Sequence, residues 1–176
     1  PGRGGQLRAA ADVASQQALW FLHADTRPEH TAAAALRESL KGGAVGGCFA
    51  FRFAGPDSVG RRTLAAMINW RAAIGIPYGD QGIFASAAAY RDAGGFADEP
   101  LFEEVTLVRG LRRLGRFDML RLPIEVSTRR WEQQGWLRRS LANRALAVGY
   151  QLGVPPGTLA KFYRPISSTR RQDTRC

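Results

Sequence analysis

Strand-length apolar runs alternate with helical segments along this chain, and this order restricts its fold more than any other feature. The run ALWFLHA at 18–24 has the length of a strand. Residues 46–55 place Phe49, Phe51 and Phe53 at every second position, which predicts a strand with one buried face. Further extended segments are predicted at 82–86 and 117–127.

Helical patterns precede and separate these runs. Residues 28–41 are predicted to form a helix, because Pro28 suits a first helical turn and Gly42 and Gly43 follow the last one. The other helices are predicted at 5–15, 57–73, 102–114 and 135–153. A chain in which helices and strands alternate favours an α/β domain with a mostly parallel, Rossmann-like sheet flanked by helices.

The beginning of the chain departs from this pattern. A domain of this kind opens with an apolar strand and a phosphate-binding turn, whereas this chain opens with PGRGGQ. We therefore expect that the first β-strand region is absent and that one domain covers 1–164. Residues 165–176 are predicted to form a basic, disordered tail.

The composition excludes several classes of protein. At 176 residues and 45% hydrophobic, the chain is long enough for one domain with a core. Cys48 and Cys176 are the only cysteines, which excludes a disulfide scaffold or structural zinc site and favours a reducing cytoplasm. No apolar run approaches the ~20 residues that span a bilayer, and no signal-peptide pattern opens the chain. We expect a cytoplasmic protein, with peripheral attachment to the inner face of the membrane as the alternative.

The net charge of +10 comes from the C-terminal part of the chain. Residues 109–176 hold 15 of the 25 lysines and arginines but 4 of the 15 acidic residues. Only Lys41 and Lys161 are lysines, so the excess is arginine, which suits the binding of phosphate or carboxylate groups. A bias in base composition explains the arginines equally well.

The motif LHADT at 22–26 offers a carboxylate at the end of a predicted strand. Asp25 follows the apolar run, and open α/β sheets bind ligands at the carboxyl ends of their strands. Carboxylates bind Mg²⁺ or Mn²⁺ together with diphosphate oxygens. His23, two residues earlier, points the same way along a strand. The alternative is that Asp25 and Thr26 only cap a turn.

The motif FEEV at 102–105 places Glu103 and Glu104 at the start of a predicted helix. The helix dipole stabilises negative charge there, so a structural role is one interpretation. A partly buried carboxylate at this position can also serve as a general base toward a hydroxyl group.

Two further motifs combine charge with a turn. Asp80 and Gln81 lie between the glycines of GDQG, which allow the backbone to approach a ligand closely, although a simple turn explains the motif equally well. Arg129, Arg130 and Trp131 end the last extended segment and offer guanidinium groups for phosphate and an indole for stacking. Such basic clusters are more often only solvated.

Together these motifs resemble the family 2 glycosyltransferases of the GT-A fold. The similarity covers residues 2–164 and is carried by GRGGQLRAAADVA, FLHADT, GDQGIF, GGF, FEEVTLVRGLRRLG and RRW. Within this family the chain is most similar to the arsenosugar-biosynthesis-type glycosyltransferases. The resemblance implies a GT-A fold that lacks its first strand region, which holds the nucleotide in this family.

The resemblance also implies a role for each motif. Asp25 matches the second aspartate of the metal motif and would bind Mn²⁺ or Mg²⁺, whereas His23 replaces the first aspartate. Glu104 matches the catalytic base, with Glu103 beside it. The implied substrate-binding residues are His23, Asp80, Gln81, Arg129, Arg130 and Trp131.

The predicted activity is that of an inverting, metal-dependent hexosyltransferase. Its donor would be a nucleotide-diphosphate sugar, its acceptor a small-molecule or lipid-linked hydroxyl, and no nucleic acid would be a partner. The alternatives are an inactive, degenerate transferase and a basic module that binds a membrane surface or a polyanion. The hypothesis of a binding module is based on a predicted helix, in which Leu137, Leu141, Val148 and Leu152 form an apolar stripe. Arg138, Arg139 and Arg144 are predicted to lie outside this stripe. Core packing explains the same stripe.

Overall fold

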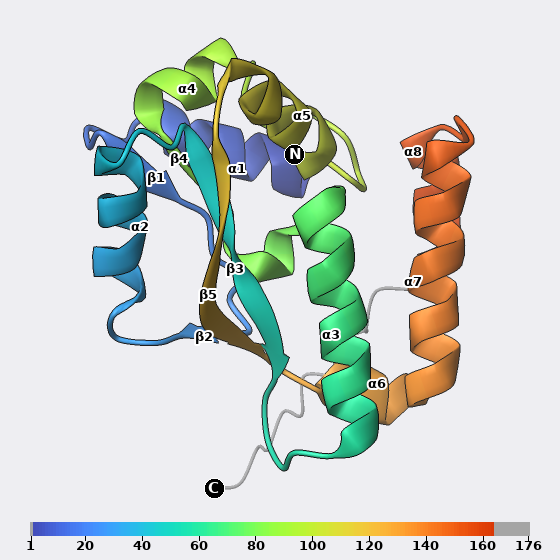
Figure 1. Cartoon of the computed structure of the whole chain (residues 1–176). Coiled ribbons are helices and arrows are strands. Elements are labelled where there is room, and N and C mark those ends of the chain that lie inside the picture. The colour runs from blue at the N-terminus through green and yellow to red at the C-terminus, as the bar shows by residue number, and fades with distance from the viewer. Residues whose placement is uncertain (1, 164–176) are drawn as a thin grey trace, which may run out of the picture. The chain divides into compact units, whose positions relative to one another are not determined.

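The chain folds into two compact units, which meet in the sequence between Thr128 and Arg129. The computed structural model describes residues 2–163 (Figure 1). We call the part that ends at Thr128 the sheet unit and the part that begins at Arg129 the helical unit. Each unit is described by itself.

Within the described residues of the sheet unit, five strands form one mixed, twisted sheet (Figure 1). Their order is β1-β4-β3-β5-β2. Only the central pair of β3 and β5 is parallel, and the other three pairs are antiparallel. The strands are β1 Ala18–Trp20, β2 Thr26–Pro28, β3 Gly46–Phe53, β4 Phe84–Ser86 and β5 Phe117–Val126.

The α/β class is confirmed, but the prediction of a mostly parallel sheet is wrong. The three short strands β1, β2 and β4, whose pairs are antiparallel, are only three residues long. An apolar run indicates a strand, but its direction depends on where the preceding loop brings the chain.

The long central strand β3 has the predicted buried face. Phe49, Phe51 and Phe53 are almost fully enclosed. The ring of Phe49 packs against Trp20 of β1 and Phe84 of β4, with centroids 5.3 and 5.6 Å apart. Phe49 therefore ties β1 and β4 to the centre of the sheet.

The strand predicted at 18–24 ends early, at Trp20. Phe21 N still donates to Ile83 O at 2.8 Å, and the chain then leaves the sheet. The helix predicted from 28 also begins later, because Pro28 belongs to β2 and pairs with Ile124. Proline is tolerated there because β2 is an edge strand of the sheet.

Helices α1, α4 and α5 share one apolar core with strands β1 and β4. The helices of the sheet unit are α1 Arg3–Asp12, α2 Ala32–Lys41, α3 Val59–Ile74, α4 Ala87–Asp92 and α5 Glu104–Leu114, and a single 3₁₀ turn, η1, covers Gly79–Gln81. The core contains Leu19, Ile83, Ala85, Ala89, Tyr90, Phe96, Leu107, Val108 and Leu111. The amphipathic pattern predicted for 102–114 is confirmed, since α5 buries Val105, Val108 and Leu111 in this core or beside it.

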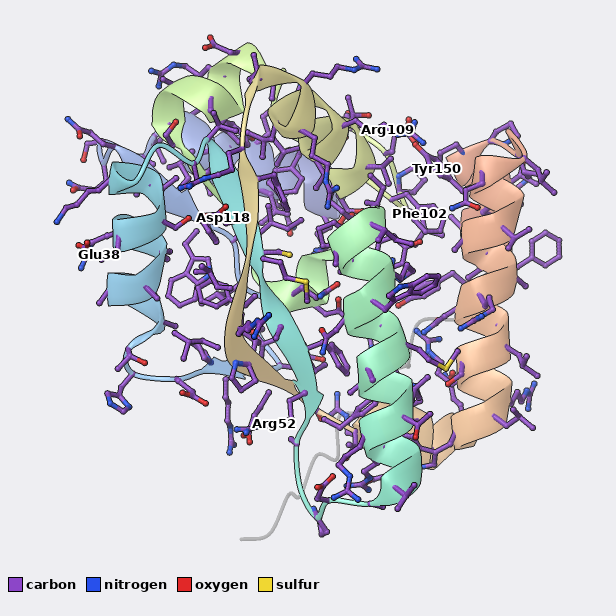
Figure 2. The ribbon with its side chains drawn as sticks, viewed as in Figure 1. Glu38, Arg52, Phe102, Arg109, Asp118 and Tyr150 are labelled. Atoms are coloured by element: carbon purple, nitrogen blue, oxygen red, sulfur yellow. The ribbon has the colours of Figure 1, made fainter. Side chains whose placement is uncertain are left out.

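Helix α2 packs against β5 through a polar contact. Asp118 of β5 points toward α2 (Figure 2), and its Oδ2 accepts a hydrogen bond of 2.7 Å from Ser39 Oγ. Helix α3 is held to β3 by Asn69, whose side chain accepts from Phe51 N at 2.7 Å and donates to Phe51 O at 3.0 Å. The two Asn69 bonds satisfy the N–H and C=O of Phe51, which the sheet ladder does not use on this side of β3.

The helical unit contains α6 Arg129–Gln134, α7 Trp136–Gln151 and α8 Pro156–Phe162. Helix α7 approaches α8 closely at Gly149, where a Cβ atom would lie 3.0 Å from Leu159 Cδ2. Arg139 is buried and donates to Tyr163 Oη at 3.0 Å. Among the helices of residues 2–163, none has the length and apolarity needed to cross a membrane. The tail predicted at 165–176 lies outside the described residues.

Candidate functional site

Three of the four motifs chosen from the sequence meet in the sheet unit. The N–H of Gly79 in GDQG donates to Glu104 Oε1 in FEEV, with 3.3 Å between the heavy atoms. The same glycine lies against His23 of LHADT, since a Cβ on Gly79 would sit 3.1 Å from His23 Nε2. Three segments that are far apart in the sequence therefore form one site.

Gly79 is required for this close approach. A Cβ atom at this position would overlap the guanidinium group of Arg3 as well as crowding His23. The absence of a side chain lets the backbone N–H reach the Glu104 carboxylate between these two groups. The structure therefore explains why position 79 is a glycine, which the sequence motif alone did not explain.

The two glutamates lie at the beginning of α5, and both are buried. Glu103 occupies the position before the helix and forms no capping hydrogen bond with its side chain. Its Oε1 instead pairs with Arg3 Nη1 at 2.9 Å. The Glu103 carboxylate therefore forms an ion pair with α1 and does not cap α5.

Burial changes the acid strength of Glu104. Loss of hydration raises the pKa of this carboxyl from 4.5 to about 7, and the negative charge of Glu103 acts in the same direction. A backbone hydrogen bond and the positive charge of Arg3 oppose the rise. A carboxyl group with a pKa near 7 can both accept and release a proton at neutral pH.

The backbone enters this site under strain. Phe102, the residue before the two glutamates, has φ 63°, and among residues 2–163 it is the only non-glycine residue with a positive φ. This left-handed conformation costs free energy for a residue with a bulky side chain. The buried Phe102 ring packs against Tyr78, with centroids 5.7 Å apart (Figure 2 labels Phe102). Packing of these rings holds the strained residue in place.

Asp80 adds a second buried carboxyl to the site. Its Oδ1 is enclosed and has no hydrogen-bond partner among the described residues. Burial raises the pKa of Asp80, with a smaller contribution from the charge of Asp25, while Arg71 and Arg3 lower it. An enclosed oxygen without a partner is unfavourable unless a ligand or water supplies a donor.

Gln81 points into the sheet and is fully buried. Its Nε2 donates to Phe49 O of β3 at 3.3 Å, which anchors η1 to the central strand. Gly82, the next residue, has φ 57°, and a Cβ there would overlap Ile124 Cδ1. The turn is therefore held tightly against the sheet, and Gln81 positions it.

Asp25 and His23 form the most accessible part of the site. The Asp25 side chain is 42% exposed, and its Oδ1 lies 3.9 Å from His23 Nδ1. Thr26 Oγ1 donates to His23 O at 2.7 Å, so Thr26 does cap the turn, as one interpretation of the sequence expected. The Asp25 carboxylate remains exposed beside this turn.

The carboxylate of Asp25 suits a cation only in combination with other oxygen atoms. No group of three or more His, Cys, Asp or Glu side chains within residues 2–163 is arranged to hold a metal ion by itself. Mg²⁺ and Mn²⁺ accept one or two protein carboxylates when the phosphates of a nucleotide complete their coordination. Asp25 therefore fits a cation that arrives with a diphosphate.

The fourth motif, RRW, belongs to the helical unit. Its three residues begin α6 rather than ending the strand β5 as predicted, because the chain turns into a helix directly after Thr128. Arg129 is exposed, whereas Arg130 Nη1 donates to Tyr163 Oη at 2.7 Å. Trp131 is buried, and its ring centroid lies 6.3 Å from that of Trp136. Two of the three side chains thus contribute to packing inside the helical unit.

The structure adds residues that the motifs did not single out. Arg3 pairs with Glu103, and Arg71 of α3 lies over the ring of Tyr78, 4.0 Å from its centroid. Burial raises the pKa of Tyr78, while the charge of Arg71 lowers it. Arg3 lies in the opening segment PGRGGQ, and Tyr78 directly precedes GDQG. Their positions next to these segments were the only features of the sequence that could have identified them.

Comparison of the chain with models of protein families, with curated proteins and with solved structures finds no match.

Proposed function

We propose that the sheet unit carries the active site of a family 2 glycosyltransferase of the GT-A fold, most similar to the arsenosugar-biosynthesis-type subgroup. The observation that supports this proposal best is the contact between FEEV and GDQG, in which a buried glutamate with a pKa near 7 lies beside the loop expected on the acceptor side. LHADT, the motif expected to hold the metal ion, joins the same site through His23.

Glu104 is the proposed general base. Its Oε1 accepts the Gly79 hydrogen bond, so Oε2 would take the proton of the acceptor hydroxyl. The hydroxyl oxygen then bonds to the anomeric carbon of the sugar, and the bond from that carbon to the diphosphate oxygen breaks. The electron pair of this bond leaves with the nucleoside diphosphate. Attack opposite the leaving group gives inversion at the sugar.

The other residues of the site would orient and balance charge. Asp25 would hold Mn²⁺ or Mg²⁺, which when bound offsets charge on the departing diphosphate. Arg3 holds Glu103 and adds positive charge near Glu104. The enclosed Oδ1 of Asp80 would accept a hydrogen bond from a hydroxyl group of the sugar acceptor. This bond would give Oδ1 the partner that it lacks among the described residues.

The helical unit enters the proposal through the RRW motif. The family resemblance implies that Arg129, Arg130 and Trp131 would bind substrate as well. The proposed partners are a nucleotide-sugar donor and a small-molecule or lipid-linked hydroxyl acceptor, and the proposed location is the cytoplasm.

The proposal is tested by release of nucleoside diphosphate from a panel of donors. The protein is incubated with Mn²⁺, a candidate hydroxyl acceptor and UDP-glucose, UDP-galactose or GDP-mannose, and the diphosphate formed is measured. Glu104→Gln keeps the side-chain size and is expected to lower the rate by about 10²- to 10⁴-fold, because the proton acceptor is lost. Glu38→Gln, on the exposed face of α2, is the matched control and should leave the rate unchanged (Figure 2).

Two results would contradict the proposal. Equal rates for the wild type and Glu104→Gln would exclude Glu104 as the base. Binding of nucleoside diphosphate without release from any donor would identify the protein as an inactive transferase. Asp25→Asn separates the role of the metal, since it should raise the Mn²⁺ concentration needed for half-maximal activity.

A further inference from the structure

Helix α7 exposes an apolar stripe to solvent. Leu137 and Leu152 are 73% and 80% exposed, and Leu141 and Val148 between them are also exposed. Their spacing places Leu137, Leu141 and Val148 on one side of the helix, and Leu152, directly after its end, continues the same side. Exposed aliphatic residues that line up along a helix indicate an interaction surface more strongly than scattered ones do.

This stripe is not the side by which α7 packs within the helical unit. Arg139, which lies on the opposite side of the helix, is the residue of α7 that is buried, and it donates to Gln134 Oε1 and Tyr163 Oη. Gly149 provides the contact with Leu159 of α8. The exposed aliphatic side of α7 therefore does not form the interior of this unit.

Positive charge is in excess in the part of the chain that contains the stripe. Residues 129–163 contain six arginines and lysines, and Glu132 is their only acidic residue. Arg138 and Arg144 are both exposed on α7. Arg144 follows Leu137 by two helical turns, so it lies on the stripe and not beside it, as the sequence pattern had suggested. The long stem of an arginine can lie along an apolar surface while its charged end reaches a phosphate.

We propose that α7 binds the surface of a membrane that contains anionic phospholipids. The four aliphatic side chains would enter the boundary between headgroups and acyl chains, and Arg138 and Arg144 would contact lipid phosphates. The helix would lie along the surface, because it is neither long nor apolar enough to cross the bilayer. The combination of an apolar stripe with an excess of arginine favours this partner over a second copy of the chain, whose own stripe would bring like charges together.

Vesicle sedimentation tests the proposal with the whole protein. We expect binding to vesicles of phosphatidylcholine mixed with phosphatidylglycerol, and much weaker binding to phosphatidylcholine alone. The double variant Leu137→Gln/Leu152→Gln should lower the affinity by about 25-fold, from roughly fivefold for each partly immersed leucine. Leu114→Gln, at an exposed leucine of α5 in the sheet unit, is the control and should have no effect.

The charge contribution is measured separately. Arg138→Gln/Arg144→Gln should weaken binding by about 25-fold, from roughly fivefold for each arginine. The matched control is Arg37→Gln, at an exposed arginine of α2. Raising the salt from about 0.1 M to about 1 M shortens the Debye length from about 10 Å to about 3 Å and should also weaken binding.

Several outcomes would overturn the proposal. Binding that is equal for both kinds of vesicle, or unchanged in Leu137→Gln/Leu152→Gln, would exclude α7 as the anionic-lipid surface. Absence of vesicle binding together with a dimer that this variant dissociates would assign the stripe to a second copy of the chain. A marked fall in thermal stability of the variant would show that the stripe is covered within the protein. None of these outcomes depends on the proposed transferase activity.

Discussion

The buried carboxyl of Glu104 makes the stability of the protein depend on pH in a direction that can be worked out. Its pKa is about 7 in the folded protein and 4.5 ordinarily, so the folded state binds this proton more tightly. The stabilisation is therefore fully present below pH 4.5 and is lost as the pH rises through about 7. Glutamine at this position cannot ionise, so Glu104→Gln should remove this contribution.

The size of the effect follows from the two pKa values. A rise from 4.5 to about 7 corresponds to about 3 kcal/mol, at about 1.4 kcal/mol for each pKa unit. Roughly 2.5 kcal/mol of this amount is lost between pH 5 and pH 8, where most of the ionisation occurs. Glu104→Gln should therefore be more stable than the wild type by an amount that grows by roughly 2.5 kcal/mol over this interval.

Urea unfolding followed by tryptophan fluorescence at pH 5 and pH 8 measures this difference. The comparison is made between variant and wild type at each pH, because the raised pKa of Asp80 acts in the same direction and remains in the variant. Glu38→Gln is the control, since its exposed carboxylate pairs with Lys41 at the surface. If the advantage of Glu104→Gln is the same at both pH values, the argument that burial penalises the ionised carboxyl is refuted.

Three further predictions concern the scaffold. Gly82→Ala should lower the free energy of unfolding by about 1–3 kcal/mol in urea titration, because residue 82 has a positive φ and a Cβ would overlap Ile124; a neutral change would refute the close approach. Asn69→Ala should cost about 1–3 kcal/mol by thermal or urea unfolding, since the N–H and C=O of Phe51 lose their partners, and an unchanged stability would show that water replaces the amide. Cys48 should not react with iodoacetamide at pH 8 until the protein unfolds, because burial raises its pKa to about 12, and rapid modification of the folded protein, detected by mass spectrometry, would contradict this.

The candidate site was predicted in part from the sequence. The motifs containing Asp25, Asp80 and Glu104 were selected because charged residues stood at predicted turns, and the structure brings all three motifs into one site. Trp131 was selected by the same reasoning, yet it is buried in the helical unit. Arg3 was missed because its partner Glu103 is distant in the sequence and no local pattern reports an ion pair between α1 and α5.

The sequence by itself determined the longer helices, the two long strands and which side of β3 is buried, but not the short strand β2 or the helices α6 and α8. These properties depend on the spacing of apolar residues and on helix-ending residues such as Gly42, which act over a few positions. Only the tertiary structure decided that the edge strands run antiparallel and that Pro28 joins the sheet. It also decided the acid strength of Glu104, because loss of hydration and neighbouring charge depend on groups that folding brings together from distant parts of the chain.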